Sequence, residues 1–118
     1  MNYRNKVVLI TGATSGIGEA CAAAFGAAGA KLVITGRNPQ KLEDCAAQLR
    51  AKNYPVLPIL ADAGSEADNR RMAEETLAHY GQLDILVNNA AISMRALFQD
   101  LDLDVGDVGE GVERELGG

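Results

Sequence analysis

The stretch that most constrains the fold is residues 7–18, VVLITGATSGIG. It begins with a short run of β-branched and aliphatic residues, which is typical of a strand buried on both faces. Three glycines follow in the spacing G-x3-G-x-G, and a helical pattern begins directly after them. Such a turn directs free backbone N–H groups and the positive end of a helix dipole at an anion. The sequence therefore predicts a turn that binds the pyrophosphate of a dinucleotide.

The three glycines have different predicted tasks. Gly12 permits the tight exit from the strand, Gly16 lets the backbone approach a phosphate, and Gly18 lets the helix pack closely on the sheet. Glycines alone are a weak signal, because turns use their backbone freedom anyway. The strand before them and the helix after them strengthen the interpretation. A Walker A loop is excluded, since no Lys-Ser or Lys-Thr pair follows the last glycine.

Two hydroxyl residues, Thr14 and Ser15, lie inside this turn. Their hydroxyls suit phosphate or ribose oxygens, and they suit local turn or N-cap hydrogen bonds equally well. The sequence leaves both interpretations open.

Apolar strand-like runs alternate with helical patterns along residues 6–88. This alternation predicts a Rossmann-like α/β fold with a doubly wound parallel sheet in the strand order 3-2-1-4. Pro58 cannot donate to a strand ladder, so the third strand is expected at a sheet edge. The expected strands are residues 6–11, 31–35, 56–61 and 83–88, and the expected helices are residues 17–28, 39–52 and 66–80.

The first helix is expected to turn one apolar stripe toward the sheet. The stripe follows the spacing i, i+4, i+7, i+8 and i+11, which falls on one helix face. Its members are Ile17, Cys21, Ala24, Phe25 and Ala28.

The chain divides into residues 1–105, a predicted dinucleotide-binding half-domain, and a tail of residues 106–118. The tail, GDVGEGVERELGG, is rich in glycine and acidic residues and has no apolar periodicity, so no regular structure is expected there. The fourth strand would then have no further neighbour. That would leave an unpaired sheet edge open to self-association.

Composition excludes several classes of protein. The net charge of −5 argues against nucleic-acid binding, which needs a basic patch. No apolar run approaches the roughly 18 residues of a membrane span, and the start MNYRNKVV has no signal-peptide pattern. Cys21 and Cys45 have neither a CxxC nor a metal-binding spacing, so we expect no metal and reduced thiols in a cytoplasmic protein.

The positive charge is concentrated where an anionic ligand would bind. Residues 1–61 hold 7 Lys/Arg and 3 Asp/Glu, whereas residues 62–118 hold 4 and 13. The half that contains the glycine-rich turn is therefore the basic half, although solvated helix faces explain most of these charges equally well.

The end of the second expected strand decides the ribose chemistry. An acidic residue there would accept from a 2′-hydroxyl and mark NAD, but this sequence has Thr35-Gly36-Arg37. No carboxylate repels a 2′-phosphate, and Arg37 can bind one bidentately. The sequence favours NADP, with NAD as the alternative. A solvated arginine in a turn is the simpler explanation of Arg37.

Polar residues also close the third and fourth strands. Asp62 can accept a hydrogen bond from an adenine amino group, or it can cap a turn before Gly64 and Ser65. Residues 88–91, Asn-Asn-Ala-Ala, close the fourth strand. Small residues there let the backbone pass against a nucleoside, and an amide can link neighbouring strand ends. An Asn pair is also an ordinary turn signal.

Together these motifs resemble the short-chain dehydrogenase/reductase family over residues 5–105. TGATSGIG at residues 11–18 is similar to the family's TGxxxGxG cofactor motif, and NNAA at residues 88–91 is similar to NNAG, with Ala91 in place of glycine. Asp62 stands where the family has an adenine-contacting Asp. The cofactor-binding residues that the resemblance implies are Gly12, Thr14, Ser15, Gly16, Ile17, Gly18, Arg37, Asp62, Ala63, Asn89, Ala90 and Ala91.

The family's catalytic residues have no counterpart in this sequence. Its second half supplies a catalytic Ser and a Tyr-x-x-x-Lys pair, in which the Tyr is the general acid/base. None of Tyr3, Tyr54 and Tyr80 is followed by a lysine four positions later. No catalytic residue is predicted, and the resemblance implies the cofactor half of an oxidoreductase that acts on a carbonyl or alcohol in its complete form. The alternatives are a non-catalytic nucleotide-binding module and a non-functional truncated product.

Overall fold

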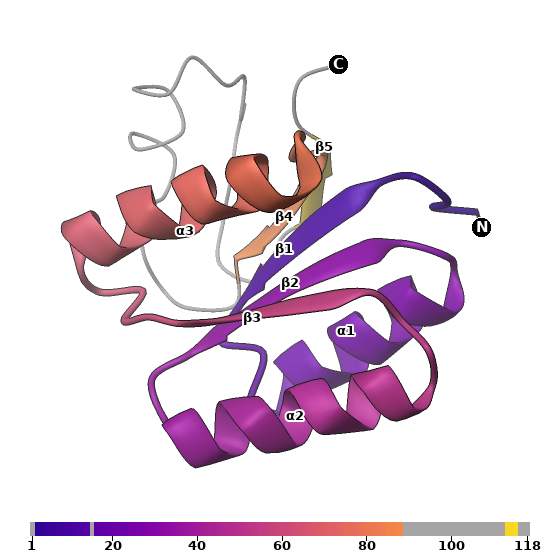
Figure 1. Ribbon diagram of the computed structural model, residues 1–118, viewed down its shortest axis with the longest axis horizontal. Coiled ribbons are helices and arrows are strands. Elements are labelled where there is room, and N and C mark those ends of the chain that lie inside the picture. Colours follow the sequence, from indigo (N-terminus) through magenta and orange to yellow (C-terminus); the bar gives the residue numbers. More distant parts are fainter. Residues whose placement is uncertain (1, 15, 89–112, 116–118) are drawn as a thin grey trace.

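The computed structural model describes residues 2–14, 16–88 and 113–115. Strands and helices alternate up to the fourth strand as the sequence predicts, with element ends that differ by one or two residues (Figure 1). The elements are β1 (Val7–Thr11), α1 (Gly16–Ala27), β2 (Lys31–Gly36), α2 (Pro39–Ala51), β3 (Val56–Leu60), α3 (Glu66–Tyr80), β4 (Ile85–Asn88) and β5 (Glu113–Glu115).

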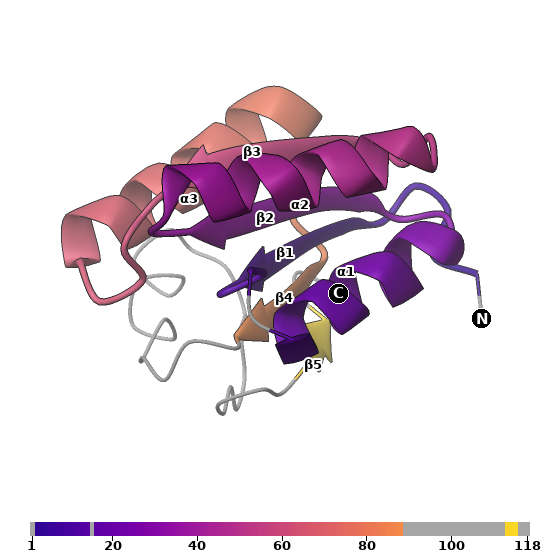
Figure 2. The same cartoon turned by 90° about the horizontal axis from the view of Figure 1, so that it is seen from below.

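The strands form one sheet in the order β3-β2-β1-β4-β5. The pairs β1·β2, β1·β4 and β2·β3 are parallel, which confirms the Rossmann-like fold and the order 3-2-1-4. Helices α1 and α2 cover one face of the sheet and α3 covers the other (Figures 1 and 2). Pro58 lies in β3 at the sheet edge, as its missing N–H requires. No helix in the described part of the chain is both long and apolar enough to cross a bilayer.

Strand β1 is the centre of the core because both of its faces are covered. All five of its residues are buried. Val7 and Leu9 pack on the side of α3, whereas Val8 and Ile10 pack on the side of α1 and α2. The continuous apolar run in the sequence is therefore the signature of a two-sided burial, with side chains alternating between two hydrophobic clusters.

The buried face of α1 differs from the expected stripe. Phe25 is buried as expected, but Ile17 is 70% exposed and Ala24 is exposed. The buried residues of α1 are Gly18, Ala22, Phe25 and Gly26. The helix turns Gly18 and Gly26 inward because only glycine allows such close packing: a Cβ on Gly26 would lie 2.3 Å from Cδ2 of Tyr54. The predicted stripe is correct for Phe25 and the half-buried Cys21 and wrong for Ile17 and Ala24, because a pattern of apolar residues does not count glycine as a buried residue.

Part of the C-terminal tail, Glu113–Glu115, forms a strand. Strand β5 pairs antiparallel with β4, with Ile85 opposite Glu115 and Val87 opposite Glu113. The expectations of an irregular tail and of an unpaired β4 edge are therefore wrong at these residues. Backbone N–H and C=O groups at a sheet edge can recruit a strand whatever its side chains, so hydrophobic patterning does not reveal the pairing.

Candidate functional site

The glycine-rich turn is held tightly between β1, β2 and α1. Gly12 has a φ of 65°, in the left-handed region that favours glycine. The N–H of Ala13 donates to the carbonyl of Thr35 at 3.0 Å, which fixes the turn against β2. A Cβ on Gly18 would lie 2.3 Å from the carbonyl oxygen of Gly12 and 2.7 Å from Cα of Ala13. Gly12 and Gly18 thus have the geometry that the sequence predicted for them.

The start of α1 at Gly16 has free space around it, as far as the described residues go. A Cβ on Gly16 would meet no atom within 4 Å in the described part of the chain. Gly16 begins α1, and Ile17 beside it is exposed. The first turn of a helix carries N–H groups without intrahelical partners, and these groups attract anions. A negatively charged group can therefore approach the backbone here without a steric obstacle from these residues.

Thr14 links the turn to the end of β2. A Cβ on Gly36 would lie 2.9 Å from Cγ2 of Thr14, so the absent side chain of Gly36 makes room for the threonine. The contact places the turn next to the residue that follows β2, Arg37. Ser15, the second hydroxyl residue of the turn, lies outside the described residues.

The ends of β1 and β4 are joined by a buried hydrogen bond. Oγ1 of Thr11 donates to Oδ1 of Asn88 at 3.2 Å, and both residues are buried. This confirms the prediction that an amide at the end of β4 links neighbouring strand ends. The other candidates of this segment, Asn89, Ala90 and Ala91, lie outside the described residues.

A pocket of about 310 Å³ lies at the carboxyl ends of β2 and β3. Ligands of doubly wound sheets bind beyond the carboxyl ends of the strands. The guanidinium of Arg37 is exposed and forms no hydrogen bond or ion pair with any other residue that the structure describes. The pocket thus combines an available cation with an apolar wall, since Leu60 is 48% exposed. Its lining residues are Arg37, Leu60, Ala61, Asp62 and Asp68.

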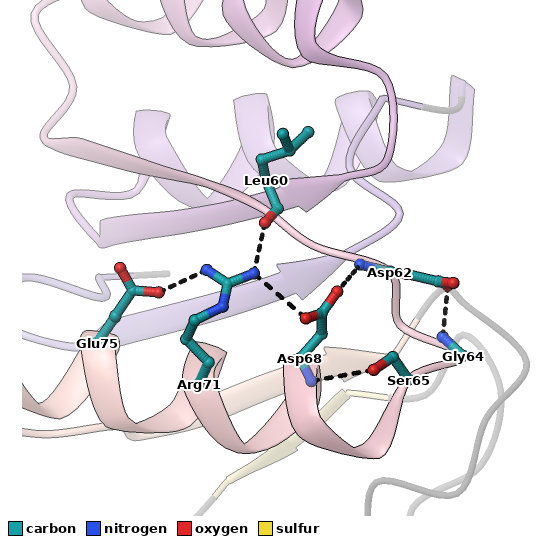
Figure 3. Close-up of polar contacts among 7 residues, drawn as sticks. All are labelled: Leu60, Asp62, Gly64, Ser65, Asp68, Arg71 and Glu75. Atoms are coloured by element: carbon teal, nitrogen blue, oxygen red, sulfur yellow. Dashed lines mark hydrogen bonds and ion pairs between the residues drawn. The ribbon is translucent and has the colours of Figure 1, made fainter.

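Asp62 fixes the loop between β3 and α3 (Figure 3). Its Oδ1 accepts from the N–H of Gly64 at 2.8 Å, and its carbonyl accepts from the N–H of Ser65 at 2.9 Å. The turn interpretation of Asp62 is therefore correct for one carboxylate oxygen. Oδ2 has no hydrogen bond to another described residue, which leaves the adenine interpretation compatible with the structure. The carbonyl of Ala63 accepts from Nδ2 of Asn69 at 3.0 Å.

Three residues of α3, Asp68, Arg71 and Glu75, form a polar network next to this loop that was not predicted from the sequence. Oδ2 of Asp68 accepts from the N–H of Asp62 at 2.8 Å. The guanidinium of Arg71 contacts Oδ1 of Asp68 at 3.5 Å and donates to Oε2 of Glu75 at 2.8 Å and to the carbonyl of Leu60 at 2.7 Å (Figure 3). The available signal was the i, i+3 and i, i+4 spacing of opposite charges along one helix.

Cys45 connects α2 to the glycine-rich turn. Its thiol is buried and lies 3.8 Å from the carbonyl oxygen of Ala13, to which it donates. Burial raises the pKa of the Cys45 thiol above its ordinary value of 9.0, and the negative charge of Glu19 raises it further. The thiol is therefore neutral at physiological pH and acts as a small packing group beneath the turn.

We expect Cys45 to be unreactive in the folded protein. The thiolate is the nucleophile that reacts with the reagent. At pH 8 the raised pKa keeps the thiolate fraction of Cys45 low, and burial keeps the sulfur out of reach of the reagent. With Ellman's reagent, the half-buried Cys21 should react first, and Cys45 only after urea unfolds the chain. A Cys21→Ser variant isolates the second reaction. Equal rates for both thiols in the native protein would contradict the buried position of Cys45.

Comparisons with known proteins agree with this geometry. The family model of the short chain dehydrogenases matches residues 6–108. "Dehydrogenase/reductase SDR family member 7B" of Bos taurus is 44% identical over 111 residues, which cover 86% of this chain and 33% of that protein. The chain spans about a third of the length of the curated relatives that it matches.

Two solved structures resemble the fold closely. A metagenomic short-chain oxidoreductase in complex with NADP has a TM-score of 0.70 and 32% identity, covering 75% of this chain and 40% of its own. A short-chain dehydrogenase/reductase from Burkholderia phymatum in complex with NAD has a TM-score of 0.74 and 32% identity, covering 78% and 33%. With the family model matching most of its length, this chain belongs to the short-chain dehydrogenase family.

Proposed function

We propose that this chain binds NADP across the carboxyl ends of β1, β2 and β3. The observation that carries the proposal is the pocket beside Arg37, where a guanidinium that is unpaired among the described residues and the carboxylate of Asp62 line one cavity. Relatives with the same fold bind NADP in one solved structure and NAD in another, so the fold accommodates either dinucleotide. The basic residue after β2 supports NADP.

The pyrophosphate is assigned to the first turn of α1. The open space over Gly16 fits a phosphate group, because no described side chain occupies it. The close packing of Gly18 on Gly12 brings the N-terminus of α1 down to the sheet. The N–H groups of this first turn and the helix dipole stabilise the negative charge. Ser15 and the exposed Ile17 complete the proposed contacts of the turn.

The adenosine is assigned to the pocket at the carboxyl ends of β2 and β3. Arg37 binds the 2′-phosphate through charge-assisted hydrogen bonds. Oδ2 of Asp62 accepts from the adenine amino group, with Ala63 beside it. Asn89, Ala90 and Ala91 are proposed to line the nucleoside on the side of β4. When bound, the cofactor supplies a hydride to a carbonyl carbon or accepts one from an alcohol.

The activity proposed for the complete form is the oxidoreduction of a small carbonyl or alcohol substrate. The 118 residues contain no Tyr-x-x-x-Lys pair, in which the Tyr would act as the general acid/base at the carbonyl oxygen. For this polypeptide alone we therefore propose cofactor binding without turnover. A non-catalytic nucleotide-binding module is the second candidate, and it shares the same binding site.

Calorimetric titration of the 118-residue chain with NADP and with NAD tests the binding. We expect saturable binding of NADP that is about tenfold or more tighter than that of NAD, because only NADP carries the phosphate that Arg37 binds. The absence of binding heat with either dinucleotide would overturn the proposal. Spectrophotometric NADPH oxidation over a panel of aldehydes and ketones tests catalysis separately, and sustained turnover would overturn the non-catalytic assignment.

A further inference from the structure

We propose that Asp68 is a positioning residue for the adenine end of the cofactor. Its carboxylate holds the backbone of Asp62, so that the Asp62 side chain keeps one oxygen available to the adenine amino group. The inference rests on the proposed NADP site. It extends that site to α3, where Asp68 lines the pocket and acts on the cofactor through the backbone of Asp62.

The departure of Asp68 from an ordinary helix cap points to this role. Ser65 is the N-cap of α3, and its Oγ accepts from the N–H of Asp68. In a capping box, the acidic side chain three residues after the cap returns to the N–H of the cap residue. Here the N–H of Ser65 donates to the carbonyl of Asp62 instead. The Asp68 carboxylate reaches further back, to the N–H of Asp62 at 2.8 Å.

Arg71 holds the carboxylate of Asp68 in this orientation. Its guanidinium contacts Oδ1 of Asp68 at 3.5 Å, which leaves Oδ2 directed at the N–H of Asp62 (Figure 3). The same guanidinium donates to the carbonyl of Leu60 at 2.7 Å. Asp68 and Arg71 therefore anchor the backbone at residues 60 and 62, on both sides of the pocket residue Ala61. Glu75 fixes the remaining edge of the guanidinium.

The consequence for Asp62 is a defined side-chain orientation. Its N–H is held by Asp68, and its Oδ1 is held by the N–H of Gly64 at 2.8 Å. Oδ2 is the remaining acceptor of a residue that lines the pocket. An acceptor in a fixed position discriminates adenine, which presents an amino group, from hypoxanthine, which presents a carbonyl oxygen. Without the Asp68 contact, the preference for adenine over hypoxanthine should fall by a larger factor than the affinity for the hypoxanthine analogue.

The test is the ratio of affinities for NADP and its hypoxanthine analogue, measured by calorimetry. We expect the wild-type chain to bind NADP about tenfold more tightly, because one charge-assisted hydrogen bond is replaced by two opposed acceptors. Asp68→Ala should reduce the ratio to about twofold or less. Asp68→Asn should keep most of it, since the amide oxygen still accepts from the N–H of Asp62. A merely stabilising role for Asp68 would lower both affinities alike and leave the ratio unchanged.

Two further variants complete the design. Glu74→Ala removes an exposed carboxylate of α3 that has no hydrogen bond or ion pair to a described residue, and it should leave the ratio unchanged. Arg71→Ala is expected to lower the ratio by a smaller factor than Asp68→Ala. It replaces Asp68→Ala in the test if the Asp68→Ala variant does not fold. An unchanged ratio in Asp68→Ala, or an equal loss in Asp68→Asn, overturns the inference. Failure of the wild-type chain to bind either dinucleotide overturns the proposed function itself.

Discussion

Replacing Gly18 with alanine is expected to lower the free energy of unfolding by roughly 3 kcal/mol, the upper end of the cost of overpacking. The new Cβ would lie 2.3 Å from the carbonyl oxygen of Gly12 and 2.7 Å from Cα of Ala13. Both atoms belong to the backbone of the turn, so no flexible side chain can move aside. Urea unfolding followed by circular dichroism measures the change. A wild-type unfolding midpoint would contradict the close packing of α1 on the turn.

Gly16→Ala is the matched control for that variant. Its Cβ would meet no described atom within 4 Å, and alanine favours a helix over glycine by up to about 1 kcal/mol in a helix interior. The free energy of unfolding should therefore stay the same or rise slightly. Affinity for NADP should nevertheless fall about tenfold or more, because the methyl group occupies the space assigned to the pyrophosphate. Wild-type affinity in this variant would contradict that assignment.

Replacing Arg37 with alanine is expected to weaken NADP binding by about 10- to 100-fold, the range for hydrogen bonds between charged groups. NAD binding should change less than about twofold, since NAD lacks the 2′-phosphate that the guanidinium binds. Stability should be unaffected, because Arg37 is exposed and unpaired among the described residues. Calorimetry with both dinucleotides at low ionic strength gives the two affinities.

Lys41→Ala is the charge-matched control for Arg37. Lys41 is an exposed cation in the first turn of α2, and its side chain has no hydrogen bond or ion pair to a described residue. The Lys41→Ala variant removes one positive charge from the same region, so it reports only the long-range electrostatic contribution to NADP affinity. If NADP affinity falls equally in both variants, Arg37 makes no direct contact with the 2′-phosphate.

The variant Arg37→Asp should go further than Arg37→Ala and reverse the preference toward NAD, because a carboxylate accepts from a ribose hydroxyl and repels a phosphate.

The element order was predictable because each signal is local. Asn38 stands directly before Pro39 at the start of α2, and its side chain caps the helix by accepting from the N–H groups of Gln40 and Lys41. Gly81 ends α3 in the left-handed conformation, with a φ of 78°. Such signals depend on neighbours within four residues along the chain. A sequence displays them directly, and the parallel order of the sheet then follows from right-handed crossovers.

The glycine motif predicted the close packing of Gly18, but apolar periodicity did not predict the rest of the buried face of α1, because that face depends on distance rather than on hydrophobicity. Gly18 and Gly26 are buried, whereas Ile17 is exposed. Packing on the turn and on Tyr54 demands the absence of a side chain, and no periodicity of apolar residues expresses that demand. The pairing of β5 with β4 depends similarly on a free backbone edge, which side-chain patterns do not reveal.

The sequence by itself determined the strand–turn–helix unit, the 3-2-1-4 order and the candidate residues Arg37 and Asp62, since these follow from local patterns and from strand ends that share one sheet edge. Only the tertiary structure decided how those residues are used. It leaves Arg37 unpaired among the described residues, commits one oxygen of Asp62 to a turn, and places Asp68 on the backbone of Asp62. These outcomes depend on which atoms approach within hydrogen-bond distance, and that is fixed by packing between elements and not by spacing along the chain.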